Sequence, residues 1–328
     1  MKVLYIIGSS RCGSTILSNI LGELDGFFSG GEIRFLWSRV LQGRKCGCGR
    51  RVDECPVWKS VLPSGGRDRQ AIQGLDEVQR ADLALRHSPS LVRRSPKKLL
   101  RSTELASYVG AMAEIYRRLG DMAGTRVVVD SSKRPSNAST LRLIPGIDPY
   151  LIHLVRDARG VAHSRLRRKA NPDGAGEMPI MSPWVNAVDW TATNLAAEDL
   201  RRHWPQHRSL LLRYEDFVAE PKVAIERIAE FVGERVGADP FVDAHSVELG
   251  PNHTVSGNPD RFQRGRVTLR ADVEWVDRMR PADRMITEAL TLPLLLRYRY
   301  RLGHSVGAAA GDIAIDGSVA RQRRRRSR

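Results

Sequence analysis

The chain has 328 residues, of which 41% are hydrophobic and 27% charged, and its formal net charge is +16. This composition is that of a globular protein with a sizeable core, and its basic balance favours an anionic ligand or surface. It excludes a disulfide scaffold, because four cysteines are too few for this length, and a membrane span, because no run approaches about 20 apolar residues. No secretory signal is visible, so we expect a cytoplasmic enzyme.

Four short apolar runs predict strands, at 2–9, 126–132, 150–157 and 209–216. They are continuously apolar, as expected for parallel strands that are buried on both faces. Between them, apolar residues at helical spacing predict helices at 14–24, 103–119, 184–204 and 221–232. Strands that alternate with helices predict a doubly wound parallel α/β sheet of the P-loop type, in a single domain.

Two segments depart from this alternation. Residues 61–102 are rich in charge and predict a helical insertion or lid. The last residues, 305–328, are rich in Gly and Ala and then in Arg, which predicts a disordered basic tail after a domain of residues 1–304.

The first strand leads into the stretch GSSRCGST at 8–15, which has the frame of a phosphate-binding loop. Its glycines let backbone N–H groups turn toward an anion, and the helix that follows adds its positive N-terminal end. The frame lacks its usual lysine, because Ser14 occupies that position and Arg11 is the cation of the loop. The alternative is a tight turn with a capping serine.

A second strand–turn–helix unit, YLIHLVRDARGVAHS, places Arg156 at a strand end and Ser164 about two turns into a helix. Both side chains are able to face one anion. The nearby cations Arg165, Arg167, Arg168 and Lys169 fit a solvated surface. Asp130 is the strand-end acid that a Mg²⁺ site would need, but Lys133 and Arg134 follow it at once, which favours neutralisation of an anion by protein cations.

With two anion units on one sheet, the chain resembles sulfotransferases that depend on 3′-phosphoadenosine 5′-phosphosulfate (PAPS). Their 5′-phosphosulfate loop, R/K-x-G-[ST]-T, is matched by RCGST, and their 3′-phosphate segment, V-R-[DN]-x-R…S, by VRDARGVAHS. RYEDFVAEP, HTVSGNPDRFQRGRVTLRADVEW and CGCGRRVDECPVW extend the resemblance over residues 1 to about 300. The pattern is that of a bacterial member, nearer to the tyrosylprotein and carbohydrate types than to the cytosolic small-molecule type.

The resemblance implies PAPS as co-substrate, with adenosine 3′,5′-bisphosphate as product and no metal required. Arg11 matches the cation that stabilises the bridging oxygen as the sulfuryl group leaves, and Cys12, Gly13, Ser14 and Thr15 complete the loop. Cys12 stands where the family often has serine, so its contact reverts to the backbone N–H. Arg156 and Ser164 match the residues that hold the 3′-phosphate.

The resemblance also implies the remaining site residues. Lys133 matches a catalytic lysine that acts on the transferred group, and Arg264, Gly265 and Arg266 fall in the basic loop that covers the cofactor. Glu32, in a GGE context, matches the general base, a reasonable role for a carboxylate in a cation-lined pocket. His253 is the alternative base.

Three cysteines lie close together at Cys46, Cys48 and Cys55. Three thiols fall short of a four-ligand zinc site, and Cys12 belongs to the anion loop. A structural metal, a disulfide to Cys55, and reduced thiols near the substrate opening remain open, and the last is favoured.

Two other classes of function compete with sulfuryl transfer. A P-loop kinase or NTPase is disfavoured by the missing lysine, and a specific nucleic-acid binder by the scarcity of aromatics among the cations. The acceptor is expected to be a small molecule, glycan, lipid or peptide that offers a hydroxyl, with an amine as the lesser alternative. Residues 61–102 and 170–190 are expected to shape its pocket, and the oligomeric state stays open.

Overall fold

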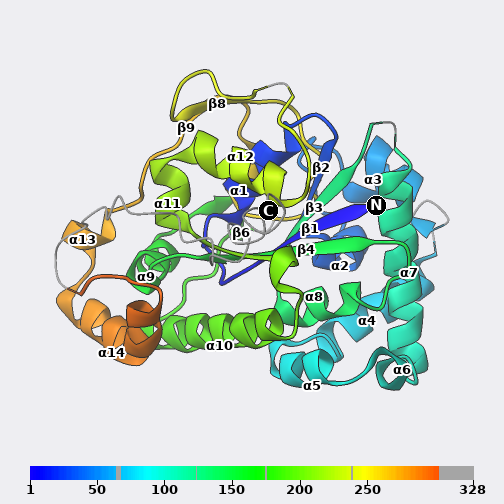
Figure 1. Cartoon of the computed structure of the whole chain (residues 1–328), viewed down its shortest axis with the longest axis horizontal. Helices are drawn as coiled ribbons and strands as arrows, with labels where there is room; N and C mark the ends of the chain where they lie inside the picture. Colours follow the sequence, from blue (N-terminus) through cyan, green and yellow to red (C-terminus); the bar gives the residue numbers. More distant parts are fainter. Residues whose placement is uncertain (64–67, 123, 174–175, 238, 303–328) are drawn as a thin grey trace, which may run out of the picture.

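The computed structural model describes residues 1–63, 68–122, 124–173, 176–237 and 239–302. Its centre is a five-stranded parallel sheet in the order β2-β3-β1-β4-β7 (Figure 1). The strands are β1 (Lys2–Ile7), β2 (Phe27–Gly31), β3 (Val127–Lys133), β4 (Asp148–Val155) and β7 (Ser209–Arg213). The predicted α/β class and four of these strands are confirmed, whereas β2 was not predicted from the sequence.

Helices cover both faces of the sheet, as the alternation along β1 requires. Leu4 and Ile6 pack with one layer, formed by α1 (Ser14–Gly22), α11 (Tyr214–Ala219) and α12 (Pro221–Phe231). Val3, Tyr5 and Ile7 pack with the opposite layer, which includes α2 (Leu36–Leu41), α3 (Pro56–Val61), α7 (Thr103–Gly120), α8 (Pro135–Leu141) and part of α10 (Pro183–Arg202).

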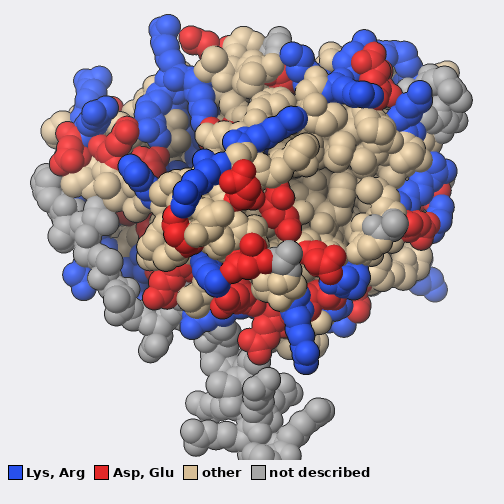
Figure 2. Space-filling model, turned by 90° about the horizontal axis from the view of Figure 1, so that it is seen from above, with Lys and Arg blue, Asp and Glu red and all other residues tan. Residues whose placement is uncertain are grey.

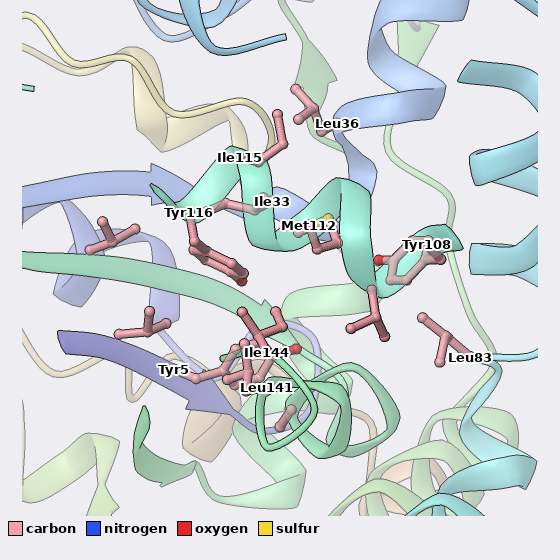
Figure 3. Close-up of a cluster of buried hydrophobic side chains, with 14 of the residues drawn as sticks. Tyr5, Ile33, Leu36, Leu83, Tyr108, Met112, Ile115, Tyr116, Leu141 and Ile144 are labelled. Atoms are coloured by element: carbon pink, nitrogen blue, oxygen red, sulfur yellow. The ribbon is translucent and has the colours of Figure 1, made fainter. Parts of the chain in front are cut away.

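Helix α7 shows how the second layer is held on the sheet. Figure 3 shows Tyr108, Met112 and Tyr116 pointing from α7 toward Tyr5 of β1 and Leu141 of α8. These side chains are all at most 5% exposed. Burial of this kind contributes roughly 1.5–3 kcal/mol for each large apolar side chain.

The segment 61–102 is helical where the structure describes it, with α4 (Arg69–Ala81), α5 (Ser88–Arg93) and α6 (Pro96–Leu99). Helix α4 packs on α2 and α7, and α5 packs on α8 and α10. The segment therefore extends the second layer beside the carboxyl ends of the strands. Its role as an insertion or lid stays a prediction.

The chain after β4 adds further elements outside the main sheet. They are α9 (Ala158–Leu166), the pair β5 (Ala170–Asn171) and β6 (Gly176–Glu177), the hairpin β8 (Ser246–Leu249) and β9 (Gly265–Thr268), α13 (Trp275–Arg278) and α14 (Pro281–Arg297). Short 3-10 turns occur at η1 (Ile33–Phe35), η2 (Val52–Glu54), η4 (Leu85–His87), η5 (Gln206–Arg208) and η6 (Pro259–Phe262). Helix α14 packs along α10 and α9 (Figure 1).

None of the helices in the described residues is long and apolar enough to cross a bilayer. The predicted basic tail, 305–328, lies outside the described residues. The extent of the domain, 1–304, stays a prediction.

Candidate active site

The loop between β1 and α1 has a backbone that only glycine permits at two points. A Cβ at Gly8 would lie 2.3 Å from the carbonyl oxygen of Leu154, and a Cβ at Gly13 would lie 2.4 Å from the ring of Tyr214. The hydroxyl of Ser14, the first residue of α1, is buried without a nitrogen or oxygen partner among the described residues. Because buried polar groups are nearly always paired, this hydroxyl marks a place for a polar ligand.

The loop opens into a cavity of about 610 Å³ at the carboxyl ends of the strands. This is where ligands bind in doubly wound sheets. Eight of the predicted site residues line it: Arg11, Gly13, Ser14, Thr15, Glu32, Lys133, Arg156 and Ser164. Cys12 does not line it, because its side chain is fully buried in the core beneath the loop.

Glu32 and Lys133 form a buried ion pair in this cavity. Glu32 follows β2 and Lys133 ends β3, where the pairing of both strands shifts register, and the Lys133 Nζ donates to Glu32 Oε1. Arg34 Nη2 lies 3.7 Å from the other carboxylate oxygen. Burial raises the pKa of Glu32. The charges of Lys133 and Arg34 lower it by a larger amount, so the pKa lies below its usual value. Glu32 is therefore an ionised carboxylate.

The backbone at the two cations of the site is unusual. Arg11 has φ 66° and Lys133 has φ 70°, and among the described residues only Arg299 joins them as a non-glycine residue with positive φ. Side chains rarely occupy this left-handed region, and such residues concentrate at functional sites. The fold thus fixes the position of both cations at a cost in backbone strain.

Arg156 follows β4 at the far side of the loop. Its Nη1 donates to the Arg11 carbonyl oxygen at 3.0 Å, and its guanidinium lies over the Tyr214 ring at 4.6 Å. Its Nη2 pairs with Asp272 Oδ2 at 3.0 Å. Burial lowers the pKa of Arg156, but Tyr214 and Asp272 raise it more, so the group stays charged.

Helix α9 contributes more to the cavity than the sequence indicates. Arg167, Arg168 and Lys169, assigned there to a solvated surface, line the cavity together with Ser164. Arg165 is buried and pairs with Asp189 at 3.2 Å. The surface interpretation is therefore wrong for Arg165, which is buried, whereas Arg167 and Arg168 stay exposed while they line the cavity.

The segment before β9 covers the loop, but with residues other than those predicted. Ser256, Gly257, Asn258 and Asp260 line the cavity, and the backbone N–H of Asn258 donates to Thr15 Oγ1 at 3.1 Å. The predicted Arg264, Gly265 and Arg266 do not line it: Arg264 donates to the Gly47 carbonyl oxygen at 3.4 Å, and Arg266 pairs with Asp243 at 2.8 Å. A role for these three in cofactor binding stays a prediction.

Two other candidate side chains lie elsewhere. Asp130 is 2% exposed, accepts hydrogen bonds from Tyr116 and Ser132, and does not line the cavity. Burial raises its pKa to about 6. His253 also lies outside the cavity lining, with Nδ1 3.2 Å from Cys55 Sγ. Of the two candidate bases, only Glu32 lines the cavity, so the geometry of the described residues favours Glu32 over His253.

Comparison with known proteins identifies the family of the chain. A model of the Sulfotransferase family matches residues 4–237, which is most of the chain. The chain belongs to the sulfotransferase family. In a comparison with solved structures, this sulfotransferase is similar to the sulfotransferase domain of the olefin synthase from Synechococcus PCC 7002, with TM-score 0.54 and 24% identity over 92% of this chain and 96% of that one.

A sulfotransferase from Mycobacterium avium is also similar, with TM-score 0.45 and 14% identity over 91% of this chain and 77% of that one. No curated protein matches. At 24% identity the likeness to the Synechococcus domain supports the fold alone.

Three lining residues of this sulfotransferase had no signal of their own in the sequence: Tyr214, Asn258 and Asp272. Each lies inside a stretch that carries the family resemblance, RYEDFVAEP or HTVSGNPDRFQRGRVTLRADVEW. Their places in the cavity depend on contacts between distant segments, so only the family pattern could have indicated them.

Proposed function

We propose that this sulfotransferase moves a sulfuryl group from PAPS to a hydroxyl of an organic acceptor and releases adenosine 3′,5′-bisphosphate, with no metal in the reaction. One observation carries the proposal: a single cavity contains an anion-binding loop, Arg156 and the Glu32–Lys133 pair. A cytoplasmic location stays a prediction.

The residues present fit such a co-substrate. The glycine backbone of the loop is suited to the 5′-phosphosulfate, as is the Ser14 hydroxyl, which lacks a nitrogen or oxygen partner among the described residues. Arg156 and Ser164 are suited to the 3′-phosphate. PAPS supplies an activated sulfuryl group whose leaving group is a phosphate.

Glu32 is the proposed general base. As the acceptor oxygen bonds to sulfur, the bond from sulfur to the phosphate oxygen breaks, that oxygen keeps the electron pair, and the acceptor proton passes to Glu32. Arg11 and Lys133 stabilise charge on the bridging and sulfuryl oxygens. When the Lys133 ammonium moves to the sulfuryl oxygens, its ion pair with Glu32 weakens. The pKa of Glu32 then rises, and the carboxylate becomes a better base.

A second cavity of about 520 Å³ adjoins the first and shares Arg34, Phe35 and Arg39 with it. From the helical segment and from 170–190, its lining includes Gln79, Arg80, Leu83, Ala84, Leu85 and Asn171. This supports the expectation that residues 61–102 and 170–190 shape the acceptor pocket. We infer that the acceptor reaches Glu32 through it.

Substitution of the base tests the mechanism. Glu32→Gln keeps the shape but removes the proton acceptor, so we expect sulfuryl transfer to fall by about 10²–10⁴-fold, while binding of adenosine 3′,5′-bisphosphate stays close to normal by calorimetry. The control is Glu248→Gln, an exposed glutamate of β8. Transfer at a near-normal rate in Glu32→Gln removes Glu32 from the base role.

Nucleotide binding separates this proposal from the two other classes. We expect tight binding of adenosine 3′,5′-bisphosphate and weak binding of ATP, and the reverse order would favour a kinase or NTPase. On the face in Figure 2, Lys and Arg are interspersed with Asp and Glu, which does not favour a nucleic-acid surface. Removal of 318–328 should abolish any salt-sensitive DNA binding without loss of transfer.

A further inference from the structure

The fold brings a histidine to the three clustered cysteines. Cys46 and Cys48 lie in the turn after α2, Cys55 directly precedes α3, and His253 lies 198 residues beyond Cys55 in the chain. The three sulfurs and one ring nitrogen of His253 all lie within 4.8 Å of one another. This cluster of four, Cys46, Cys48, Cys55 and His253, lies outside the lining of both cavities described above.

The distances are close to those of a tetrahedral zinc site. With Zn–S bonds of about 2.3 Å and Zn–N bonds of about 2.0 Å, neighbouring ligand atoms are separated by about 3.5–3.8 Å. His253 Nδ1 is 3.2 Å from Cys55 Sγ. Small side-chain movements would place all four atoms around one ion.

The backbone around the cluster is built for this approach. A Cβ at Gly47, between the first two cysteines, would lie 1.9 Å from Asn252 Oδ1, so only glycine lets the two segments meet. The Gly47 N–H donates to the Thr254 carbonyl oxygen at 2.9 Å. The Trp58 indole N–H donates to the His253 carbonyl oxygen at 2.6 Å, which fixes the backbone of the histidine.

Backbone N–H groups also point at two of the sulfurs. The N–H of Cys48 is directed at Cys46, and those of Val57 and Trp58 are directed at Cys55. Such outer contacts orient metal ligands. Cys46 and Cys55 are buried, and Cys48 and His253 are half-buried.

We propose that Cys46, Cys48, Cys55 and Nδ1 of His253 bind one Zn²⁺ ion in a closed structural site. Three thiolates and an imidazole form one of the ligand sets typical of structural zinc, and four protein ligands leave no open position for catalysis. A disulfide would use only two of the three sulfurs and give no role to His253. The site is separate from the proposed transfer reaction, which needs no metal.

The ion would hold the covering segment in place. Two residues past His253, the Val255 N–H donates to Gly30 in β2, and Ser256 accepts from the Glu32 N–H at 3.0 Å. The same segment reaches Thr15 through Asn258. Zinc would therefore connect residues 46–55 to β2, which Glu32 follows, and to the anion loop.

Metal content tests the site in the whole protein. Wild type purified without chelator should contain about one zinc per chain by mass spectrometry of the metal. Replacement of Zn²⁺ by Co²⁺ should give the visible bands of tetrahedral cobalt and a thiolate charge-transfer band. Less than about a tenth of an equivalent after zinc addition, or a native disulfide among the three cysteines, would overturn the proposal.

Matched variants assign the ligands. Cys55→Ser and His253→Ala should lose most of the zinc and alter the cobalt spectrum, whereas Cys12→Ser and His245→Ala should keep both. Equal retention of zinc in all four variants would contradict the assignment. If the ligand variants fail to fold, the wild-type cobalt spectrum still decides. Neither readout depends on sulfuryl transfer, so failure of one proposal leaves the other intact.

Discussion

The two proposed anion-binding units of this sulfotransferase are built in different ways. The β1–α1 loop relies on its own backbone, with two glycines at close contacts and a buried Ser14 hydroxyl that lacks a nitrogen or oxygen partner among the described residues. The β4–α9 unit relies on the Arg156 side chain, whose guanidinium already pairs with Asp272. The first unit is thus organised before an anion binds, whereas the second must exchange one anionic partner for another.

Because the two units differ in this way, we expect one to act mainly on the rate of transfer and the other mainly on the affinity for the nucleotide. A preorganised loop stabilises charge that develops during transfer without further rearrangement. An arginine that is already paired contributes to the binding free energy only the difference between its interaction with the ligand and its interaction with the earlier partner. Substitutions in the first unit should therefore act mainly on turnover, and substitutions in the second mainly on nucleotide affinity.

The largest effect is expected at the loop cation. Arg11→Ala removes a charge from the leaving-group side, so turnover should fall by about 10²–10³-fold. Binding of adenosine 3′,5′-bisphosphate should weaken only modestly, because the loop backbone remains. Steady-state kinetics and calorimetry measure the two quantities.

Arg126→Ala is the matched control for that loss. Arg126 precedes β3 at the opposite end of the sheet, where it pairs with Glu234 at 2.9 Å. Its turnover should equal that of wild type. If Arg11→Ala instead reduces affinity and turnover equally, the claim that the first unit acts mainly on turnover is wrong.

An intermediate effect is expected at the second unit. Arg156→Ala removes charge-assisted hydrogen bonds worth about 1.5–3 kcal/mol, so the Kd for adenosine 3′,5′-bisphosphate should rise by about 10–100-fold. Turnover at saturating PAPS should change much less. Arg208→Ala is the control, since Arg208 also pairs with an aspartate and lies over a tyrosine ring, but near the start of β4.

The sequence predicted the structural features that depend on residues close together in the chain. The apolar runs of β1, β3, β4 and β7 and the glycine loop are local patterns, and each element lies within a few residues of its prediction. Strand β2 was missed because FFSGG has no β-branched residue and ends in two glycines. The family resemblance nevertheless indicated Glu32, the residue that follows it.

The features that sequence could not predict depend on contacts between distant segments. Arg167 is exposed, as its sequence context predicts, but it also lines the cavity because the fold places the end of α9 there. His253 is brought to the three cysteines by the pairing of Gly47 with Thr254, a contact across 207 residues that no spacing rule encodes. In the same way, Asp272 reaches Arg156 only through the path of the chain after β9.

The smallest predicted effect tests the partner exchange itself. If Arg156 holds a phosphate, Asp272 competes with that phosphate for it. Burial raises the pKa of Asp272, but Arg156 and Arg167 lower it by more, so the carboxylate stays ionised with a pKa below its usual value. Asp272→Asn removes that competing charge. Because partly exposed pairs are worth about 0–1 kcal/mol, adenosine 3′,5′-bisphosphate should bind about two- to fivefold more tightly.

Asp243→Asn, which removes the partner of Arg266 outside the cavity, should leave this affinity unchanged. Weaker binding in Asp272→Asn would mean that Asp272 orients Arg156 for the phosphate instead of competing with it. In that case both units are preorganised, the first by backbone and the second by an acidic side chain. Calorimetry separates these outcomes by the sign of the change in affinity: competition predicts tighter binding in Asp272→Asn, and orientation predicts weaker binding.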